Sequence, residues 1–597
     1  MNFVRKLLKL LKFLPKKRTR QLNILFVLGL ITSISEIVSI GALLPFLNAI
    51  SNPSYMLENS YIQIITTSFK ITSPRDLSIL LSLVFILAIV IANGLRLITL
   101  WVQTKLVALM ANDLSFACYR TSILQPYSFY LKSNSSTIIV QSTEYVDGTI
   151  GIIYASLSFI LSFLTLIAIL FGLLIVNWKI TLGGILIISV MILPVINFSK
   201  YRLTKNSRQI ANYSQMRIKL IQESIGGIRD ILLGGSQSIF LKNFYITDLT
   251  LRKLHANNQF LGSVNRPYME AMTMGAIVLL ILFMLQTNAS PSTVLTILGT
   301  MILGLNRLLP LVQQCYSYWA FMRSNSSYLY EILVVLQRPI SQYYLEPKSN
   351  VLSFKKEIRL DNVGFRYSSE LDWVLQNVNL TIPVNQTIGF FGGSGCGKTT
   401  TADLILGLIK PELGELFVDN TSLTDDKLRW AWQKNVTNVP QSIYLSDASI
   451  AENIAFGLEA SEIDINRVKE AAYLAQIHEF VEKLPNKYQE TVGERGVRLS
   501  GGQRQRIGIA RALYKRASLI IFDEATSALD NETEQEVMDA IYNLRERVTI
   551  IIIAHRLSTL RLCSQVFEFK DGIISFKGSG KDIAGKPIED ASEKLLI

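Results

Sequence analysis

Six long apolar runs, each close to or above 20 residues, occupy the part of the chain before about residue 325. A helix needs about 20 apolar residues to cross the hydrocarbon core of a membrane. The pattern therefore predicts six transmembrane helices, over residues 22–50, 77–101, 150–176, 180–198, 270–287 and 293–323. From about residue 355 short strand-like runs alternate with turns and charged residues become dense, which indicates a soluble α/β domain.

The connections between these runs differ in length and charge. Residues 102–149 and 199–265 form long connections, whereas 177–179 and 288–292 are tight turns. The 199–265 segment holds ten basic and three acidic residues, but 51–76 holds two of each. Because basic residues favour cytoplasmic loops, we expect the amino terminus and both long connections to be cytoplasmic.

The first twenty residues are basic and contain leucines at helical spacing. They hold eight basic and no acidic residues, and a 29-residue apolar stretch follows without a small-residue cleavage site. We therefore expect an interfacial helix rather than a cleavable signal. The chain carries 59 basic and 46 acidic residues, a net charge of +13. A nucleic-acid partner is one reading of this charge, but the basic cytoplasmic flank accounts for it and predicts none.

The pattern divides the chain into four parts and predicts a multidomain protein, all-α in the membrane and α/β in the soluble part. The parts are a basic amphipathic segment 1–21, a six-helix transmembrane domain 22–335, a linker 336–354 and a nucleotide-binding domain 355–597. The segment SYIQIITTSF after the first span could form a short helix on the outer leaflet. The four cysteines are far apart and predict neither a disulfide framework nor a zinc site.

Four ionisable side chains in or beside the predicted spans need an explanation, because a charge inside a membrane is costly and faces a cavity or a partner. They are Glu36, Arg96, Arg266 and Arg307. Arginines directed into a shared cavity would suit a phosphate or pyrophosphate, which guanidinium binds through paired hydrogen bonds. Internal pairing with Glu36 or Glu270 is the alternative, and snorkelling to the interface could also explain Arg266.

A complete phosphate-binding motif follows the buried strand IGFF. It consists of Gly392, Gly393, Ser394, Gly395, Cys396, Gly397, Lys398 and Thr399, with Thr400 next in the helix. In such a loop, backbone N–H groups surround the phosphates of a nucleotide, the lysine neutralises the outer ones and the Thr399 hydroxyl reaches Mg²⁺. The motif predicts binding of ATP and Mg²⁺.

A second buried strand, LIIFDE, ends in two carboxylates. Two acids at the end of an apolar strand are costly unless they have a function. Asp523 takes the metal side in this interpretation, and Glu524 is placed to polarise an attacking water.

The segment LSGGQRQRIGIARAL, which includes Ser500, Gly501, Gly502 and Gln503, resembles the signature of ATP-binding cassette proteins. The resemblance implies that Ser500 and its glycines contact the γ-phosphate of ATP held by the other cassette of a dimer. It also implies that Tyr367 stacks on adenine, that Gln441 lies near Mg²⁺ and that His555 contacts the γ-phosphate. Residues 527–530 would lie at the dimer seam, and TVGERG, which resembles a stretch of exporters, favours export over import.

A membrane domain followed by one cassette is similar to half-transporter exporters, which couple ATP hydrolysis to alternating access. Since every ATP-site motif is intact, we expect a homodimer. Glu36 with Pro45 in SEIVSIGALLPFL, Arg96, NRPYMEA and NRLLPL make the chain most similar to bacterial flippases of lipid-linked oligosaccharides. This resemblance implies that Arg96, Arg266 and Arg307 bind the pyrophosphate. The expected location is the bacterial cytoplasmic membrane, with the cassette in the cytoplasm. Export of another lipid, a glycolipid, a peptide or a drug is the alternative, and an ATP-gated channel or sensor is a further one.

Overall fold

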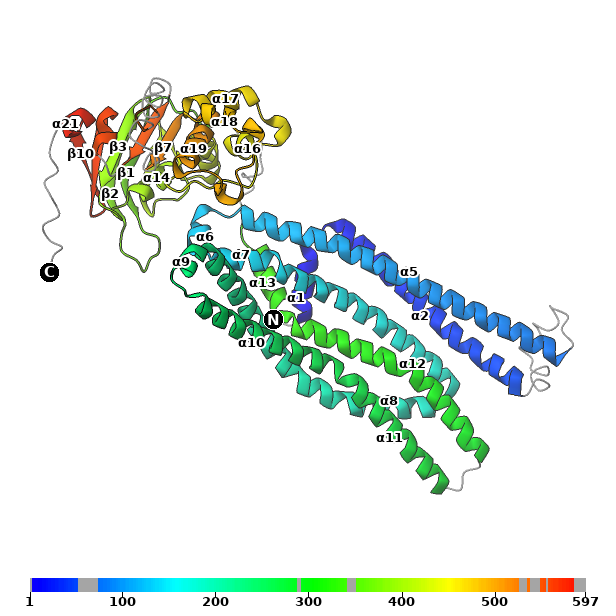
Figure 1. Cartoon of the computed structure of the whole chain (residues 1–597). Coiled ribbons are helices and arrows are strands. Elements are labelled where there is room, and N and C mark those ends of the chain that lie inside the picture. Colours follow the sequence, from blue (N-terminus) through cyan, green and yellow to red (C-terminus); the bar gives the residue numbers. More distant parts are fainter. Residues whose placement is uncertain are drawn as a thin grey trace. The chain divides into compact units, whose positions relative to one another are not determined.

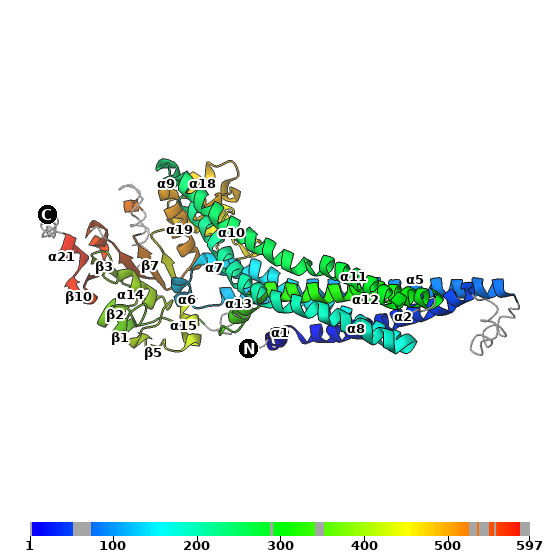
Figure 2. The same cartoon turned by 90° about the horizontal axis from the view of Figure 1, so that it is seen from below.

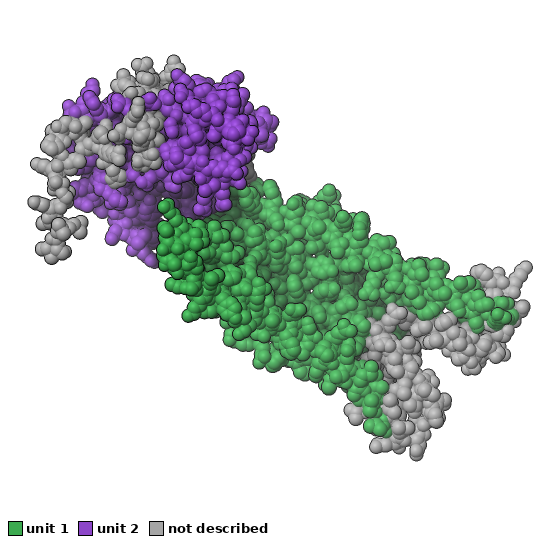
Figure 3. All heavy atoms as spheres, viewed as in Figure 1, with its two compact units in different colours: residues 1–125, 133–340 green, residues 126–132, 341–597 purple. Residues whose placement is uncertain are grey.

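The chain forms two compact units in the computed structural model (Figure 3). The structure describes residues 3–51, 73–286, 291–340, 351–524, 534–536, 548–554 and 557–584, and for 291–307 it describes the backbone alone. The first unit comprises residues 1–125 and 133–340, and the second comprises 126–132 and 341–597. Residues 126–132 therefore group with the carboxyl-terminal unit although they lie between long helices of the other unit in the sequence.

Long helices build the first unit, and Figures 1 and 2 show α2 and α5 side by side. These helices are α2 (Lys16–Ser51), α5 (Pro74–Ile123), α8 (Glu144–Gly226), α10 (Gln237–Ser263), α11 (Asn265–Gln286) and α12 (Pro291–Ser324). Within the described residues, four stretches are long and apolar enough to span a membrane: Lys16–Ser39, Arg75–Ile123, Ser135–Ile175 and Thr181–Gly226. The predicted spans 270–287 and 293–323 fall largely on α11 and α12, whose lengths of 22 and 34 residues suit a crossing.

Helix α8 is assigned as one element of 83 residues, yet its chain reverses direction. The Tyr145 hydroxyl donates a hydrogen bond of 2.9 Å to the carbonyl oxygen of Ala211. On a straight helix these residues would lie roughly 100 Å apart. The Thr181 hydroxyl also reaches the Leu173 carbonyl, eight residues back, at 3.0 Å. The chain therefore turns back between residues 173 and 181, where the sequence predicts a tight turn, and α8 supplies two antiparallel spans.

Among the described residues, five short helices accompany the long ones; four belong to the first unit, and α6 belongs to the second. They are α1 (Phe3–Lys12), α6 (Tyr127–Lys132), α7 (Ser135–Ser142), α9 (Ile228–Leu233) and α13 (Ser326–Leu336). The amino-terminal segment in which an interfacial helix is predicted does form a helix, α1. Three predicted segments lie wholly or partly outside the described residues: SYIQIITTSF, residues 288–290 of the turn 288–292, and most of the linker 336–354.

Polar pairs join the helices of the first unit inside its apolar packing. The hydroxyls of Thr32 and Thr99 are 2.7 Å apart, and the Gln103 amide donates to the Ser158 hydroxyl at 2.6 Å. Such pairs connect α2 with α5 and α5 with α8. Interhelical hydrogen bonds of this kind, together with close packing, hold transmembrane helices together where water is excluded.

The second unit contains two sheets. The six-stranded sheet has the order β10-β9-β3-β8-β7-β6, with β3, β6, β7, β8 and β9 parallel, and the four-stranded antiparallel sheet has the order β2-β1-β4-β5. The strands are β1 (Glu357–Phe365), β2 (Leu375–Pro383), β3 (Thr387–Gly392), β4 (Leu413–Val418), β5 (Thr421–Ser422), β6 (Val436–Val439), β7 (Leu519–Asp523), β8 (Thr549–Ile553), β9 (Gln565–Lys570) and β10 (Ile573–Gly578). The helices are α14 (Lys398–Ile405), α15 (Asp426–Gln433), α16 (Ile450–Ile454), α17 (Ile465–Leu474), α18 (His478–Glu482), α19 (Gly501–Lys515) and α21 (Gly580–Ala584).

The buried strands explain this sheet order. The central strand β8 consists of Thr549 and four isoleucines, and all five residues are buried. Strands buried on both faces read as continuous apolar runs and occur in parallel sheets covered by helices. Because β3 and β7 flank β8 and run parallel to it, the loops after Gly392 and Asp523 leave the same edge of the sheet. Ligands bind at this edge in open α/β sheets.

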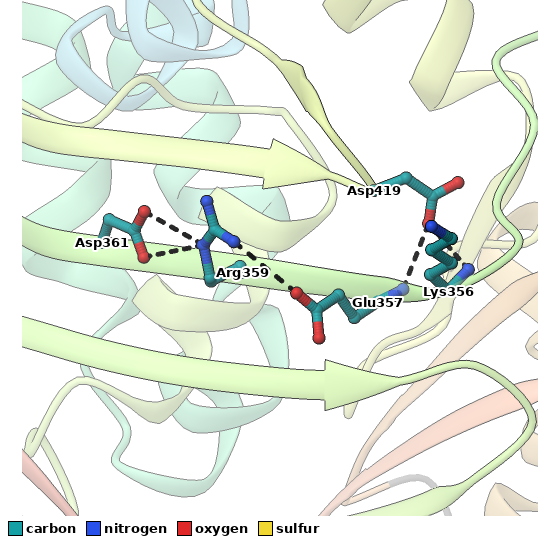
Figure 4. A network of polar contacts seen from close by, with 5 residues as sticks. All are labelled: Lys356, Glu357, Arg359, Asp361 and Asp419. Carbon is teal, nitrogen blue, oxygen red and sulfur yellow. Dashed lines mark hydrogen bonds and ion pairs between the residues drawn. The ribbon is translucent and has the colours of Figure 1, made fainter.

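The start of the antiparallel sheet is fixed by a polar network (Figure 4). The Asp419 carboxylate accepts the backbone N–H groups of Lys356 at 2.7 Å and Glu357 at 3.1 Å. Along β1, the Arg359 guanidinium pairs with Asp361 at 3.0 Å and with Glu357 at 3.6 Å. Alternate residues share one face of a strand, so this acid-base-acid row covers the outside of β1 and fixes where the sheet begins after the linker.

Candidate nucleotide site and membrane cavity

The loop between β3 and α14 needs its glycines. Gly392, Gly395 and Gly397 have φ of 147°, 77° and 101°, a region that other residues rarely adopt. A Cβ at Gly392 would lie 2.3 Å from the carbonyl oxygen of Phe569, and one at Gly397 would lie 2.7 Å from Leu375. A Cβ at Gly395 would meet nothing within 4 Å. The loop is thus packed against the sheet at its two ends and open at its middle.

Lys398 lies over this loop. Its ammonium donates hydrogen bonds to the carbonyl oxygens of Gly392 at 3.0 Å and Gly393 at 2.7 Å, and its side chain is buried. It also lies 3.7 Å from the Cys396 thiol. A buried ammonium held by two neutral carbonyls is an attractive partner for an anion, because charge-assisted hydrogen bonds are about twice as strong as neutral ones.

The carboxylates at the end of β7 face two polar side chains. The Thr399 hydroxyl donates to Asp523 at 3.2 Å, and the Gln441 amide donates to Glu524 at 2.7 Å. Glu524 has φ of 50°, while its backbone N–H donates to the Ile553 carbonyl at 3.0 Å. A non-glycine residue in the left-handed region carries strain, which is common at functional positions. The structure therefore brings Thr399, Gln441, Asp523 and Glu524 to one place beside the loop.

These groups fit a hydrated divalent cation. Hydroxyl, carboxylate and amide oxygens are the ligands that Mg²⁺ prefers, and it is held by one or two carboxylates together with nucleotide phosphates. Thr399, Gln441 and Asp523 supply such a set. No cluster of three or more His, Cys, Asp or Glu side chains suited to a metal occurs among the described residues.

Asp403 belongs to this site although the sequence motifs do not include it. Burial and the nearby Asp523 carboxylate raise the pKa of Asp403 to about 6. Both effects disfavour the charged carboxylate. Thr399 and Asp403 are four residues apart on α14, so helical spacing alone could have placed them on one face.

The expected adenine-stacking residue, Tyr367, lies beside this helix. Its hydroxyl is 3.0 Å from that of Thr400, and its ring meets Phe365 edge to face at 5.1 Å. Tyr127 of α6 lies near it, and burial, with Asp403 and Tyr367 close by, raises the pKa of the Tyr127 phenol. No sequence signal could identify Tyr127, because it precedes Tyr367 by 240 positions and belongs to no motif.

The signature residues form a separate local structure. Ser500 caps α19: its hydroxyl accepts the Gln503 backbone N–H at 3.2 Å, and the Gln503 side chain accepts the Ser500 N–H at 2.8 Å. Gly501 and Gly502 form the first turn of this helix. A helix amino terminus favours anions. Among the described residues, no hydrogen bond joins Ser500 or Gln503 to the phosphate-binding loop.

Two predicted elements fall beyond the part of the chain that the structure describes. They are His555 and residues 525–533, which include the expected dimer-seam segment 527–530.

A cavity of about 560 Å³ lies among α2, α5, α8 and α12. Twelve of its nineteen lining residues have polar side chains, which carry hydroxyl, amide and two charged groups, while apolar atoms form the larger part of its surface. The polar lining residues are Thr32, Glu36, Asn93, Arg96, Thr99, Gln103, Tyr154, Ser158, Ser162, Thr165, Gln314 and Tyr318. A polar cavity of this size between membrane helices is able to hold part of a polar ligand.

The three predicted substrate arginines differ in their surroundings. Arg96 lines the cavity and forms no ion pair with another residue that the structure describes. Arg266 is exposed and pairs with Glu270 at 3.0 Å, one turn along α11, and it does not line this cavity. The side chain of Arg307 lies outside the described residues. Arg266 thus forms the ion pair with Glu270 that was one of its predicted alternatives. Among the three arginines, Arg96 is the one whose described side chain lines the cavity.

Known proteins share both parts of this architecture. A family model described as ABC transporter matches residues 375–527. An "ATP-dependent lipid A-core flippase" of Saccharophagus degradans is 31% identical over 469 residues, 76% of each chain. One of Cupriavidus metallidurans is 30% identical over 71% of each chain. A "Heterocyst differentiation ATP-binding protein HepA" of Nostoc sp. is 30% identical over 76% of this chain and 74% of its own.

A solved structure shares the fold. The structure of a bacterial Atm1-family ABC exporter with ATP bound superposes with a TM-score of 0.75, covering 95% of this chain and 96% of the other at 19% identity. These relatives match both units of the chain. The cassette also carries the intact phosphate loop, the carboxylates at the end of β7 and the signature helix. The chain belongs to the ABC transporter family, as an exporter-type half-transporter that is integral to the membrane and carries a cytoplasmic cassette whose ATP hydrolysis drives transport.

Proposed function

We propose that two copies of this chain form a flippase that moves a lipid-linked oligosaccharide, a polyprenyl-pyrophosphate glycan, across the bacterial cytoplasmic membrane. The observation that carries this proposal is the polar cavity that contains Arg96 inside a membrane-spanning unit. A guanidinium binds phosphate oxygens through paired hydrogen bonds. Hydroxyl and amide side chains around it suit the hydroxyl groups of a sugar, and the surrounding apolar helices suit a lipid chain.

The neighbouring polar side chains support this assignment because most of them are already ordered. The Ser162 hydroxyl donates to Gln314 at 3.3 Å and the Gln103 amide donates to Ser158. Held side chains reduce the entropy lost on binding. Arg96 has no such fixed partner among the described residues, so its hydrogen-bonding capacity is available to an anionic ligand.

In the cassette, each side chain has a defined task in ATP hydrolysis under this proposal. Lys398 neutralises the outer phosphates and the backbone N–H groups of the loop position them. Glu524, held by the Gln441 amide, accepts a hydrogen bond from the attacking water and orients it. Mg²⁺, when bound by Thr399, Gln441 and Asp523, would offset negative charge on the phosphates. His555 would hold the γ-phosphate beside Glu524.

The proposed homodimer would combine the signature helix of one copy with the phosphate loop of the other. The signature helix α19 presents Ser500 at a positive amino terminus with no described bond to its own phosphate loop. Ser500, Gly501, Gly502 and Gln503 of one copy would complete the ATP site of the other copy. Two identical chains then form two equal sites, because every motif of both halves is present in one sequence.

A glycolipid with a phosphorylated headgroup, such as lipid A-core, is the second candidate. Flippases of that name are among the relatives that are about 30% identical over most of this chain. The two substrates share sugars, phosphates and hydrocarbon chains, so the same cavity chemistry suits both. They differ in the pyrophosphate and in the number and shape of the lipid chains.

Transport in proteoliposomes tests the proposal. One preparation contains a fluorescent polyprenyl-pyrophosphate oligosaccharide and a second contains a fluorescent lipid A-core, each with purified wild-type chain or Glu524→Gln. We expect ATP-dependent flipping of the oligosaccharide by the wild type alone. Flipping of lipid A-core alone would establish the second candidate, and vigorous ATP hydrolysis without flipping of either lipid would exclude both.

A further inference from the structure

A small cavity of about 80 Å³ lies in the cassette beside α15, and it shares no residue with the nucleotide site. Its walls come from residues 409–411, from β4, from residues 423–424 and from Arg429 of α15. A water molecule takes up about 30 Å³ in the liquid. The cavity therefore has room for two or three waters or for one small polyatomic ion.

The charged side chains that line this cavity are both basic. They are Lys410 and Arg429, and the Thr424 hydroxyl is the remaining polar side-chain group of the lining. Both cations pair with Asp426, whose carboxylate lies 2.8 Å from the Lys410 ammonium, but Asp426 does not line the cavity. Two positive charges and one negative charge give this cluster a net charge of +1. The cavity is thus bordered by the positive members of the cluster.

Arg429 has unused hydrogen-bonding capacity at this place. The residue is 7% exposed, and its Nη2 group donates to Asp426, whereas its Nη1 group is buried and has no hydrogen-bond partner in the described part of the chain. Packing holds the stem of this side chain, because a Cβ at Gly407, whose φ is 70°, would lie 2.9 Å from Arg429 Cγ. A buried charged donor without a partner is costly. The fold therefore fixes the guanidinium and leaves one of its nitrogens for a ligand.

From these observations we infer that the cavity is a binding site for a small oxyanion of the phosphate class, separate from the ATP site. The free Nη1 group of Arg429 gives a charge-assisted hydrogen bond to one oxygen. The Lys410 ammonium supplies a second positive charge, and the Thr424 hydroxyl donates to a further oxygen. Water would fill the space but would not balance the charge of the two cations. A nucleotide is too large for this volume, so the ligand is a free ion such as inorganic phosphate.

Thermal unfolding of the full chain in detergent tests the inference. Mg²⁺ and a non-hydrolysable ATP analogue are present at saturation, so that the phosphate loop is filled. Sodium phosphate is compared with sodium chloride and sodium acetate at equal ionic strength. A ligand that binds the folded state raises the unfolding temperature, and we expect a saturable rise with phosphate at lower concentration than with either other salt. The lack of a saturable rise with phosphate would mean that water alone fills the cavity and would overturn the inference, as would a stronger effect of acetate.

Two substitutions should shift phosphate binding in opposite directions. Lys410→Gln removes a cation of the lining, and the half-maximal phosphate concentration should rise roughly threefold to tenfold, since this lysine is half exposed. Asp426→Asn removes the negative charge that competes for both cations, and the half-maximal concentration should fall by a similar factor. If the cluster only stabilises the fold, both variants will unfold at lower temperature without phosphate and neither will change the half-maximal concentration, which would contradict the inference.

The matched control is Lys427→Gln, which removes an exposed lysine of the same helix that does not line the cavity. It should keep the wild-type half-maximal concentration, and an equal loss in Lys427→Gln and Lys410→Gln would show a general charge effect and overturn the inference. Arg429→Lys should lose most of the response, because one ammonium cannot serve Asp426 and the anion with the geometry of a guanidinium. Its unfolding temperature without phosphate shows whether it folds, and the Lys410 and Asp426 variants decide the question in either case.

Discussion

The cassette and the membrane-spanning unit position their polar groups by different means. In the cassette, Lys398, Thr399, Asp523 and Glu524 come from loops and helix starts at one edge of a parallel sheet, and short hydrogen bonds set their geometry. In the other unit, the cavity draws its polar side chains from four long helices. The geometry of the ATP site is therefore set by the local backbone, whereas the shape of the cavity depends on how the helices pack. A change in helix packing can thus alter the ligand of the cavity while the chemistry of the cassette stays the same.

The largest expected effect comes from Glu524→Gln, which tests the local chemistry of the cassette. ATP hydrolysis should fall roughly 10²–10⁴-fold because the water loses its orienting carboxylate. Binding of ATP should persist, since Lys398 and the loop are untouched. Phosphate release and nucleotide binding measure the two separately. Glu459→Gln, an exposed residue with no site contact, is the control, and turnover near wild type in Glu524→Gln would remove Glu524 from its assigned role.

Alkylation of the phosphate loop should have the next largest effect. Cys118, Cys315 and Cys563 are buried, whereas Cys396 is partly exposed; burial also raises the pKa of the Cys563 thiol to about 12, which makes it unreactive. N-ethylmaleimide should therefore modify Cys396 first and remove most ATP binding by filling the loop. Cys396→Ser should bind ATP and resist the reagent, and bound ATP should slow modification of the wild type. Equal inactivation of Cys396→Ser would show that another thiol is responsible.

Arg96→Ala should have an intermediate effect and tests the cavity. Loss of hydrogen bonds to a charged group costs about 1.5–3 kcal/mol, roughly 10- to 100-fold in affinity for an anionic substrate. Arg266→Ala should reduce apparent affinity much less, because its side chain is exposed and pairs with Glu270 outside this cavity. The concentration of fluorescent lipid that gives half-maximal flipping measures both. A greater loss in Arg266→Ala would locate the phosphate site away from the cavity around Arg96.

The smallest effect is expected from Asp403→Asn and concerns stability without nucleotide. The folded-state pKa of Asp403 is raised from 3.8 to about 6, so the folded protein binds more protons between these values and its stability falls as pH rises through them. At about pH 7.5 the variant should be more stable than wild type by on the order of 1 kcal/mol, after allowing for solvent screening. The difference should shrink towards pH 4. Thermal unfolding at a series of pH values measures it, and a constant difference would mean that the Asp403 charge is not its cause.

The sequence predicts the cassette better than the cavity for a physical reason. Residues 392–399 and 519–524 are contiguous motifs, and the structure places each on the expected strand, loop or helix. The reversal of α8 at a short polar turn was also predictable. The surroundings of Arg96 were not, because they depend on which helix faces meet, whereas the Arg266–Glu270 pair is four residues apart on α11 and was one of the alternatives that the sequence offered. Tyr127 and Asp403 were missed since their contacts arise only after folding, although the Thr399–Asp403 spacing gave a hint.

Helix α6 gives the chain a property of a different kind. Residues 126–132 group with the cassette, but peptide bonds join them at both ends to helices of the membrane-spanning unit. The backbone therefore connects the membrane-spanning unit to residues 341–597 at one place, after residue 340, and α6 belongs to the cassette through its packing alone. A displacement of the cassette reaches Gln125 and Ser133 only through the noncovalent contacts of α6, such as those of Tyr127 near Asp403 and Tyr367, and then passes along the backbone to α5 and α7. Removing those contacts should therefore uncouple ATP use from transport while each unit stays folded.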